Sequence, residues 1–563
     1  MSARIANRRI RLLVALFAVV FAAALVRAGW LQAVQAPALD RLASDQYRQT
    51  VAIPARRGTI SDANGVELAV GERATTVYAN PREIVDARAA AVVAGEALGL
   101  DPDALFRVLS DRSKGFVYIA RKADPETAEQ LAREKIPGLG FYPEERRAYP
   151  LGDTAAEVIG YAGLDNEGLD GLELQLDREL SGSTGSKTIV RDPGGRTIDV
   201  VQSKPVVDGS DVRLTIDHVI QRELERVLQK TRERWSAATT TGVVLDPRTG
   251  AILAMAVEPG YDANRFPEVT DDLQRNRAVT DTYEPGSTLK VVAISAELER
   301  GDVDPWTTFT LPPTIQVSDR VIKEHDPRGT ETMTVSQILA ESSNVGTVTL
   351  ALRLGKPALS QWIRRFGFGR RTGIDFPGES PGIVPGLDDW SGSTIGTLPI
   401  GHGIAVTAVQ MAAAYGALAN KGVWNRPHLV ARIEGRDAPR PERRRILTIK
   451  TAATVRKMLS RVVSEGTGTE AQIPGYSIAG KTGTAAKPDP EGGYSKTRYV
   501  GSFVGFLPVK SPRVVILVAV DEPRGTIWGG TVAAPAFAEI ATFLAQYLEI
   551  APDRPAQLAA ATG

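Results

Sequence analysis

The sequence predicts a membrane-anchored chain with two folded parts: a mixed α+β domain, followed by an α/β sandwich that carries a helical subdomain. Three observations lead to this prediction. At 563 residues the chain is too long for one compact core. A basic N-terminus precedes a long apolar run, and strand patterns flank a mainly helical middle in the second half. Hydrophobic content of 43% and charged content of 24% are typical of globular domains.

The N-terminal segment has the pattern of a single membrane-spanning helix. Residues 12–33 are apolar apart from Arg27 and a few weakly polar positions, and this length is about what a helix needs to span a bilayer. Arginines crowd residues 1–11, which predicts a cytoplasmic N-terminus and an extracytoplasmic body. A cleaved signal peptide and a buried core helix are the alternatives. Arg27 and Trp30 disrupt a small-x-small cleavage site, so an uncleaved anchor in the cell (inner) membrane is favoured.

The first folded part is expected to span residues 34–210. It begins with a predicted polar helix at 34–50 and continues as short strands and turns. A hairpin is indicated near its end by two alternating runs, "SKTIV" and "RTIDVV", around Asp192-Pro193-Gly194-Gly195. The connecting text at 205–211 marks the expected domain boundary.

The second part is expected to span residues 211–550. A strand at 211–217 and a helix at 218–235 open it, and two strands joined by the turn 246–250 follow. The middle, from Ser287 to about Leu418, is mainly helical. Strands return in "YSIAGKTGTAAK", "YVGSFVGFLPV" and "RVVILVAVDEP", and an amphipathic helix covers about 534–548. Residues 551–563 are expected to form a disordered tail.

Composition excludes several function classes. The net charge of +1 provides no basic excess for binding nucleic acid by bulk charge. The chain has no Cys, which excludes disulfides, thiolate catalysis and Cys-based zinc sites. Its four His residues are scattered and form no H-E-x-x-H pattern, so neither a metal site nor a cofactor is expected.

The stretch "YEPGSTLKVV" contains a candidate nucleophile, Ser287, and a candidate base, Lys290. Three residues apart on a helix, the two side chains share a face. Apolar neighbours predict a dry environment, which lowers a lysine pKa and suits a general base. The alternative is that Ser287 only caps a helix, and the S-x-x-K pattern alone does not decide between these interpretations.

Two further stretches of sequence bear on whether Ser287 is a nucleophile or only a helix cap. "ESSNVG" places Ser342 two residues before Asn344, and "AGKTGTAAK" places Lys481-Thr482-Gly483-Thr484 on a predicted strand. Taken singly, the first could be a helix cap and the second a solvated strand edge. On an exposed edge, however, a lysine could bind a carboxylate, threonines could add hydrogen bonds, and Gly483 could leave room for a peptide that adds to the sheet.

The order S-x-x-K, S-x-N, K-T-G is the set described for penicillin-binding proteins and β-lactamases. With these motifs the chain resembles a class B penicillin-binding protein over nearly its whole length after the anchor. "RRGTISDANGVELA", "RRAYPLGDTAAEVIGYAG" and "GLDGLELQLDREL" resemble the family's pedestal motifs, and "TDTYEPGST" is most similar to the septal cell-division branch. The resemblance implies a pedestal (dimerisation-type) domain and a transpeptidase domain with a five-stranded antiparallel sheet between helices.

The resemblance also implies a role for each motif residue. Ser287 attacks the D-Ala-D-Ala bond of a stem peptide, Lys290 accepts its proton, and Ser342 with Lys481 passes a proton to the leaving amine. Asn344 orients the substrate. The implied substrate-binding residues are Thr482, Gly483 and Thr484, and the amides of Ser287 and Thr484 form the oxyanion hole. β-Lactams, as mimics of D-Ala-D-Ala, are expected to acylate Ser287.

Several alternatives to a septal transpeptidase remain. An elongation-type or sporulation transpeptidase, a D,D-carboxypeptidase and a non-catalytic scaffold share much of the pattern. A class A β-lactamase is disfavoured because no E-x-E-L-N-like stretch lies between Asn344 and Lys481. The expected partners are peptidoglycan stem peptides, β-lactams, a SEDS-family glycosyltransferase and other membrane proteins of the division machinery, with no nucleic acid.

Overall fold

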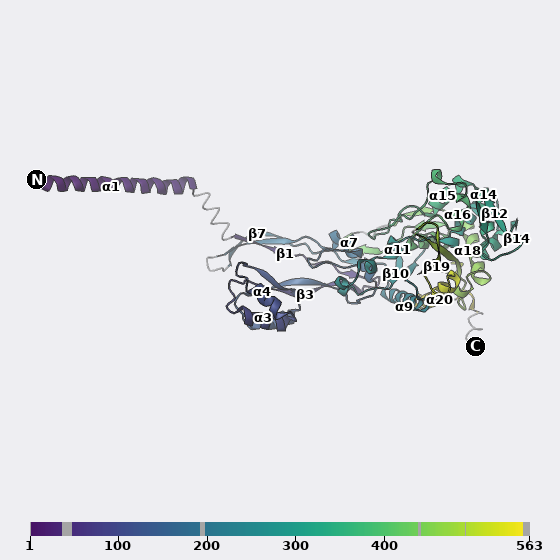
Figure 1. Ribbon diagram of the computed structural model, residues 1–563, viewed down its shortest axis with the longest axis horizontal. Coiled ribbons are helices and arrows are strands. Elements are labelled where there is room, and N and C mark those ends of the chain that lie inside the picture. Colours follow the sequence, from purple (N-terminus) through teal and green to yellow (C-terminus); the bar gives the residue numbers. More distant parts are fainter. Residues whose placement is uncertain (1, 36–47, 192–196, 437–440, 490, 556–563) are drawn as a thin grey trace. The chain divides into compact units, whose positions relative to one another are not determined.

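A computed structural model describes residues 2–35, 48–191, 197–436, 441–489 and 491–555, and the chain divides into two compact units (Figure 1). The first unit consists of Met1–Arg56 and Gly182–Gly209. It contains one helix that is long and apolar enough to cross a membrane, with a mean hydropathy of 2.4, as expected for the anchor. The elements of this unit are α1 (Ser2–Trp30), η1 (Leu31–Gln35), β1 (Arg48–Ile53), β6 (Gly185–Arg191) and β7 (Thr197–Lys204).

The segment after the anchor differs from the prediction of a polar helix at 34–50. Residues 36–47 lie outside the described part, and the chain from Arg48 onward is strand β1, which pairs antiparallel with β6. The predicted hairpin is confirmed as β6 and β7, which pair antiparallel, although its turn at 192–196 also lies outside the described residues. Pairing with a distant strand therefore decides the conformation at 48–50 over local polarity.

The second unit consists of Arg57–Ser181 and Ser210–Gly563. Its N-terminal part is built on a sheet with the order β16-β8-β2-β3-β4, in which β5 also pairs with β3. Helices α3, α4 and α5 pack on this sheet through apolar side chains such as Val77, Ile119 and Leu131 (Figure 1). The elements are β2 (Ile60–Ser61), β3 (Glu67–Ala79), α3 (Ala87–Leu98), α4 (Pro102–Leu109), β4 (Val117–Ala123), α5 (Pro125–Arg133), β5 (Leu139–Ala148), α6 (Ala156–Ile159), α7 (Gly171–Gln175), α8 (Asp177–Leu180), β8 (Val212–Leu214) and β16 (Val430–Ile433).

A buried ion cluster holds this part together. The carboxylate of Glu173 accepts hydrogen bonds from Nε of Arg57 and Nε of Arg147, each at 2.6 Å, and its side chain is 0% exposed. Arg57 also contacts Asp177 at 2.7 Å. Two guanidinium groups thus share one buried carboxylate. The sequence stretches that resemble the family's pedestal motifs contain these residues and therefore have a structural role here.

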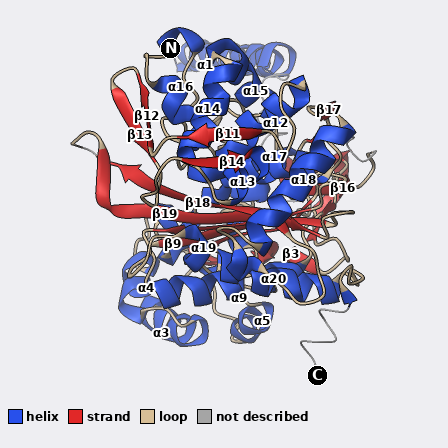
Figure 2. Ribbon diagram, turned by 90° about the vertical axis from the view of Figure 1, so that its right-hand side faces the viewer, coloured by secondary structure: helices blue, strands red, loops and turns tan. Residues whose placement is uncertain are grey.

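The C-terminal part of the second unit contains the predicted five-stranded antiparallel sheet, in the order β10-β9-β20-β19-β18. Figure 2 shows helices on both of its faces. Helix α17 is buried along its whole length, which fits its apolar sequence. The elements are α9 (His218–Trp235), β9 (Thr239–Leu245), β10 (Ile252–Glu258), α12 (Lys290–Arg300), α17 (Ala408–Ala419), α18 (Ile449–Ser464), β18 (Ala479–Pro488), β19 (Tyr494–Leu507), β20 (Val514–Asp521), α19 (Gly529–Val532) and α20 (Ala534–Tyr547).

The helical middle contains more strand than predicted. Four short strands form two hairpin-like pairs, β11 with β14 and β12 with β13. The remaining elements of the second unit, within this middle and on either side of it, are η2 (Ala263–Glu268), α10 (Asp271–Gln274), α11 (Arg277–Thr280), η3 (Gly286–Leu289), β11 (Thr308–Leu311), β12 (Thr314–Val317), β13 (Arg320–Lys323), β14 (Glu331–Thr334), α13 (Val335–Ala340), α14 (Asn344–Leu354), α15 (Lys356–Phe366), η4 (Leu387–Asp389), α16 (Thr394–Thr397), η5 (Leu398–Ile400), β15 (Val423–Asn425), β17 (Arg443–Arg445) and η6 (Thr469–Ala471).

The domain boundaries drawn from the sequence stay a prediction. Within the second unit, residues on both sides of position 210 belong to one compact body. At the other end, Asp553 accepts hydrogen bonds from the amide and hydroxyl of Ser477, so the segment expected to be a free tail is tied down at its start. Residues 556–563 lie outside the described part.

Candidate active site

Ser287 lies on a 3₁₀ turn, η3, which leads directly into helix α12. The N-cap position of η3 is Pro285, and Ser287 makes no capping hydrogen bond, so the helix-cap interpretation of this serine is wrong. Among the described residues, no hydrogen-bond partner is found for its hydroxyl. The hydroxyl is half-buried and available to attack a substrate.

Two glycines let this turn pack closely on the edge strand β18. Gly286 has a φ of +54°, and a Cβ there would lie 2.9 Å from the carbonyl oxygen of Thr484. A Cβ on Gly483 would lie 2.8 Å from the carbonyl oxygen of Pro285. The space at Gly483 is therefore taken by the turn that carries Ser287, whereas the sequence suggested space for the substrate backbone. This packing brings the backbone of Ser287 next to that of Thr484.

Lys290 is fully buried at the start of α12 and points to the S-x-N motif. Its Nζ lies 2.7 Å from Oδ1 of Asn344 and 3.1 Å from Oγ of Ser342, and it also donates to the carbonyl oxygen of Ser342. Burial, with a smaller contribution from the positive charge of Lys481, lowers the pKa of Lys290 well below its usual value. A neutral amine has two N–H bonds, so it can donate to two of these three oxygens and keep one lone pair, which is what a general base requires.

The S-x-N motif lies on a strained turn between α13 and α14. Ser342 has a φ of +59°, in the left-handed region that serine rarely adopts, and such strain is often found at functional sites. Ser343, between the two motif residues, is the N-cap of α14. The carboxylate of Glu324 accepts hydrogen bonds from the hydroxyl of Ser343, the amide of Asn344 at 2.7 Å and the amide of Val345 at 3.2 Å.

The K-T-G motif lies on β18, which is the last strand of its sheet. Lys481 is fully buried, and its Nζ lies 3.4 Å from both the carbonyl oxygen and the hydroxyl of Thr482. The hydroxyl of Thr482 is 2.8 Å from that of Thr467, and the hydroxyl of Thr484 accepts from the amide of Gly529. A sheet edge with a buried lysine and flanking hydroxyls can bind an extended peptide with a terminal carboxylate.

The buried lysines make stability depend on pH. Burial lowers the pKa of Lys481 from 10.5 to about 7. Between about pH 7 and 10.5 the unfolded chain therefore binds more protons than the folded chain, and the free energy of unfolding rises with pH in this window. We expect Lys481→Met to flatten this rise, measured by urea unfolding at pH 7 and pH 9. The exposed Lys457→Met is the control and should keep the wild-type slope; equal slopes in all three proteins would contradict the assignment.

Comparison with known proteins agrees with this geometry. The family model "Penicillin binding protein transpeptidase domain" matches residues 240–542, and "Penicillin-binding Protein dimerisation domain" matches residues 52–214. The chain belongs to the class B penicillin-binding proteins. The resemblance inferred from the motifs is thus confirmed, including its D,D-transpeptidase class.

Relatives of this penicillin-binding protein cover almost all of the chain. The probable peptidoglycan D,D-transpeptidase PenA of Neisseria gonorrhoeae is 34% identical over 98% of this chain and 95% of its own. The peptidoglycan D,D-transpeptidase FtsI of Escherichia coli K12 is 32% identical over 94% and 90%. The crystal structure of penicillin binding protein 3 of Mycobacterium tuberculosis complexed with aztreonam has a TM-score of 0.72 and 33% identity, covering 90% of this chain and 99% of that one.

Glu324 is a candidate positioning residue that the motif search missed. It has no motif of its own, and only the fold brings it to the N-terminus of α14, where a carboxylate is favoured by the free amides. We expect Glu324→Ala to slow acylation by penicillin about 10-fold or more, because the strained Ser342–Asn344 turn loses its anchor. The exposed Glu331→Ala, on the neighbouring strand, is the control and should acylate at the wild-type rate. Equal rates in Glu324→Ala and wild type would contradict this role.

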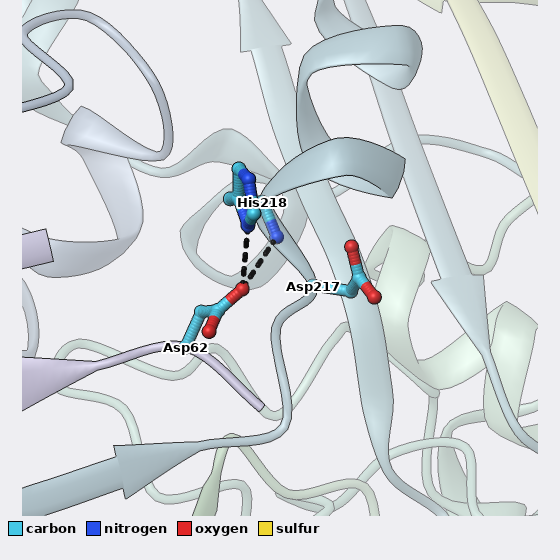
Figure 3. A group of neighbouring side chains, drawn as sticks. All are labelled: Asp62, Asp217 and His218. Carbon is cyan, nitrogen blue, oxygen red and sulfur yellow. Dashed lines mark hydrogen bonds and ion pairs between the residues drawn. The ribbon is translucent and has the colours of Figure 1, made fainter. Parts of the chain in front are cut away.

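A second polar cluster lies away from the catalytic residues. Asp62, Asp217 and His218 have donor atoms within 4.8 Å of one another, the one such group found in the described residues (Figure 3). Nδ1 of His218 lies 2.7 Å from Asp62, whose other oxygen accepts two backbone amides. Asp217 caps α9 and accepts a hydrogen bond from Tyr547. The carboxylates are already satisfied by protein donors, so this cluster joins the turn after β2 to α9 and gives no reason to infer a metal centre.

Proposed function

We propose that this protein cross-links peptidoglycan stem peptides during septal cell-wall synthesis, through an acyl-enzyme on Ser287. The observation that carries the proposal is the meeting of three sequence-distant motifs at one sheet edge. Lys290 contacts Ser342 and Asn344 directly, and the turn of Ser287 packs on Gly483 and Thr484.

In the proposed acylation, Oγ of Ser287 attacks the carbonyl carbon of the penultimate D-Ala while Lys290 accepts the hydroxyl proton. The amides of Ser287 and Thr484 stabilise the oxyanion, with about 3–4 kcal/mol per donor in comparable sites. The C–N bond then breaks, and the terminal D-Ala leaves after its nitrogen receives a proton through Ser342 and Lys481. An amine of a second stem peptide attacks the ester, forms the new amide and releases Ser287.

The proposed substrate contacts follow from the edge strand. The donor peptide adds to β18, and Lys481, Thr482 and Thr484 bind its terminal carboxylate. Asn344 orients the peptide amide opposite this strand. Of these residues, Lys481 is the basic one, and because it is fully buried its protonated form attracts a carboxylate more strongly than an exposed lysine would.

Labelling with fluorescent penicillin tests the nucleophile. Wild type should be labelled and Ser287→Ala should not. Ser295→Ala, which removes a buried hydroxyl from the following helix, is the matched control and should retain the label. Labelling of Ser287→Ala at the wild-type level would overturn the assignment.

A carboxypeptidase would use the same acyl-enzyme with water as acceptor, so product analysis separates the two activities. We expect cross-linked dimers when a donor and an amine acceptor are supplied together. Release of D-Ala without any dimer would favour the carboxypeptidase instead. For the septal role, depletion should give filaments, whereas rounded cells would favour an elongation role.

The proposed topology places residues 1–11 in the cytoplasm and the folded body outside the membrane. The arginines before the apolar helix support this orientation. Because the chain has no Cys, a single cysteine at position 5 or 555 can be probed with a membrane-impermeant maleimide; only position 555 should react in intact cells or spheroplasts. A SEDS-family glycosyltransferase and other division proteins are the proposed membrane partners.

A further inference from the structure

The carboxylate of Glu284, three residues before the nucleophile, joins three separate segments. One oxygen accepts hydrogen bonds from the amide of Gly403 and the hydroxyl of Tyr494, each at 2.8 Å. The other lies 2.9 Å from Nδ1 of His402. The Glu284 side chain is only 9% exposed, whereas its bonds to Gly403 and Tyr494 lie at the surface and its bond to His402 is partly buried.

The segment that carries Glu284 borders a cavity on one side, and the Tyr283 side chain next to it packs against the hydrophobic core. A cavity of about 380 Å³ separates it from the sheet and is lined by Tyr283, Glu284, Ala485 and Val500 among other residues. Backbone bonds between Tyr283 and Val406 and from the amide of Gly286 to Gly401 hold the segment from the side. Hydrogen bonds to the 401–406 segment, from the backbone and from the Glu284 carboxylate, therefore contribute to its position.

The far end of the β18–β19 hairpin depends on the same carboxylate. The regular pairing of β18 with β19 is interrupted between Ala486 and Pro488, and Pro488 then pairs with Tyr494. The Tyr494 ring also meets His402 edge-on, with centroids 5.7 Å apart. Burial, together with the hydrogen bond to Glu284, raises the pKa of Tyr494 to about 12, so its hydroxyl keeps the proton that it donates.

We propose that Glu284 is a positioning residue for acylation: it fixes the spacing between the turn of Ser287 and strand β18. The two amides of the proposed oxyanion hole come from these two elements, Ser287 from the turn and Thr484 from the strand. They stabilise the same oxygen only while the elements keep their spacing. This inference rests on the proposed acyl-enzyme function.

The test separates the rate of acylation from penicillin binding. In Glu284→Ala, the limiting acylation rate constant should fall about 10- to 100-fold, with the dissociation constant for penicillin changed by less than about threefold, because misplaced donors act mainly on the transition state. Glu284→Gln keeps one accepting oxygen, so its acylation rate constant should fall less than that of Glu284→Ala. Tyr494→Phe removes one hydrogen bond, and its acylation rate constant should fall about threefold. It provides a milder variant if Glu284→Ala folds poorly.

A matched control distinguishes positioning from general stability. Glu379 is also buried and accepts three bonds, from the amide and hydroxyl of Thr372 and the amide of Gly373, but makes no contact with the motif residues. Glu379→Ala should lower stability and leave the acylation rate constant of the active fraction unchanged. An unchanged rate constant in both Glu284→Ala and Tyr494→Phe, or an equal loss in Glu379→Ala, would overturn the proposal. Failure of the proposed function itself would show separately, as labelling of Ser287→Ala.

Discussion

Lys290→Met should lower the rate of acylation by penicillin about 10²- to 10⁴-fold, the contribution expected of a general base. The methionine fills the buried space of the lysine stem but has no lone pair that can take up the proton of Ser287. Stopped-flow acylation with a fluorescent penicillin measures the effect. The exposed Lys450→Met, a control with the same substitution, should react at the wild-type rate.

The pH dependence of the acylation rate provides a second test with Lys290→Met. Because burial lowers the pKa of Lys290, the wild-type acylation rate should fall as pH decreases through that lowered value and the amine becomes protonated. The residual rate of Lys290→Met should lack this acidic limb. A retained limb, or a loss of less than about threefold, would show that another group accepts the proton. Thermal unfolding is measured in parallel, because the variant removes a buried amine but also leaves the carbonyl oxygen of Ser342 and Oδ1 of Asn344 without this donor.

Glu173→Ala should lower the free energy of unfolding by about 3–5 kcal/mol, because removing one partner leaves buried charges uncompensated. Both guanidinium groups that it binds, those of Arg57 and Arg147, are at most 2% exposed at the side chain. Urea unfolding measures the change. The control is Glu129→Ala, which breaks an exposed helical pair with Arg133 and should change stability by less than about 0.5 kcal/mol.

This prediction also separates the structural cluster from the catalytic residues. Any Glu173→Ala protein that remains folded at low temperature should acylate at the wild-type rate constant, because the cluster has no contact with the motif residues. A loss of stability under about 1 kcal/mol would contradict the buried-pair account, since the pair would then be contributing no more than a surface one.

The sequence indicated the candidate site residues because each lies in a short motif, and their catalytic roles stay a proposal. Ser287 and Lys290 are three residues apart, Ser342 and Asn344 are two apart, and Lys481 to Thr484 are consecutive, so local spacing brings the members of each motif together. Strands were predicted from the sequence pattern in the regions of β9, β19 and β20, whereas the five-stranded antiparallel sheet was implied by the family resemblance.

Residues that act across the fold could not be predicted in this way. Glu284 and Glu324 are single acids, and their partners, His402 and Tyr494 for the first, lie more than a hundred residues away or on a different element. Residues 48–50 of strand β1 were predicted as helix because the pairing of β1 with β6 is also non-local. In each case the deciding contact is made only after the chain folds.

The neighbours of Gly483 also could not be predicted from the sequence, although this residue lies within a motif. The pattern correctly indicated that a side chain is not tolerated there, but not which neighbour excludes it. In the structure the neighbours are Oγ of Ser502 on β19, which would lie 2.5 Å from a Cβ at Gly483, and the Pro285–Thr288 turn, whose nearest atoms would lie at 2.8 and 3.1 Å. Close approach of two protein segments and close approach of a substrate leave the same sequence signature.

The central claim is that Ser287 is the residue that becomes acylated, and mass spectrometry tests it most directly. The full-length protein is incubated with penicillin, its intact mass is measured, and the adduct is located by proteolysis and fragmentation. We predict one penicillin per chain, attached to Oγ of Ser287, and no adduct in Ser287→Ala. An adduct on any other residue, or a stoichiometric adduct that persists in Ser287→Ala, would contradict the account.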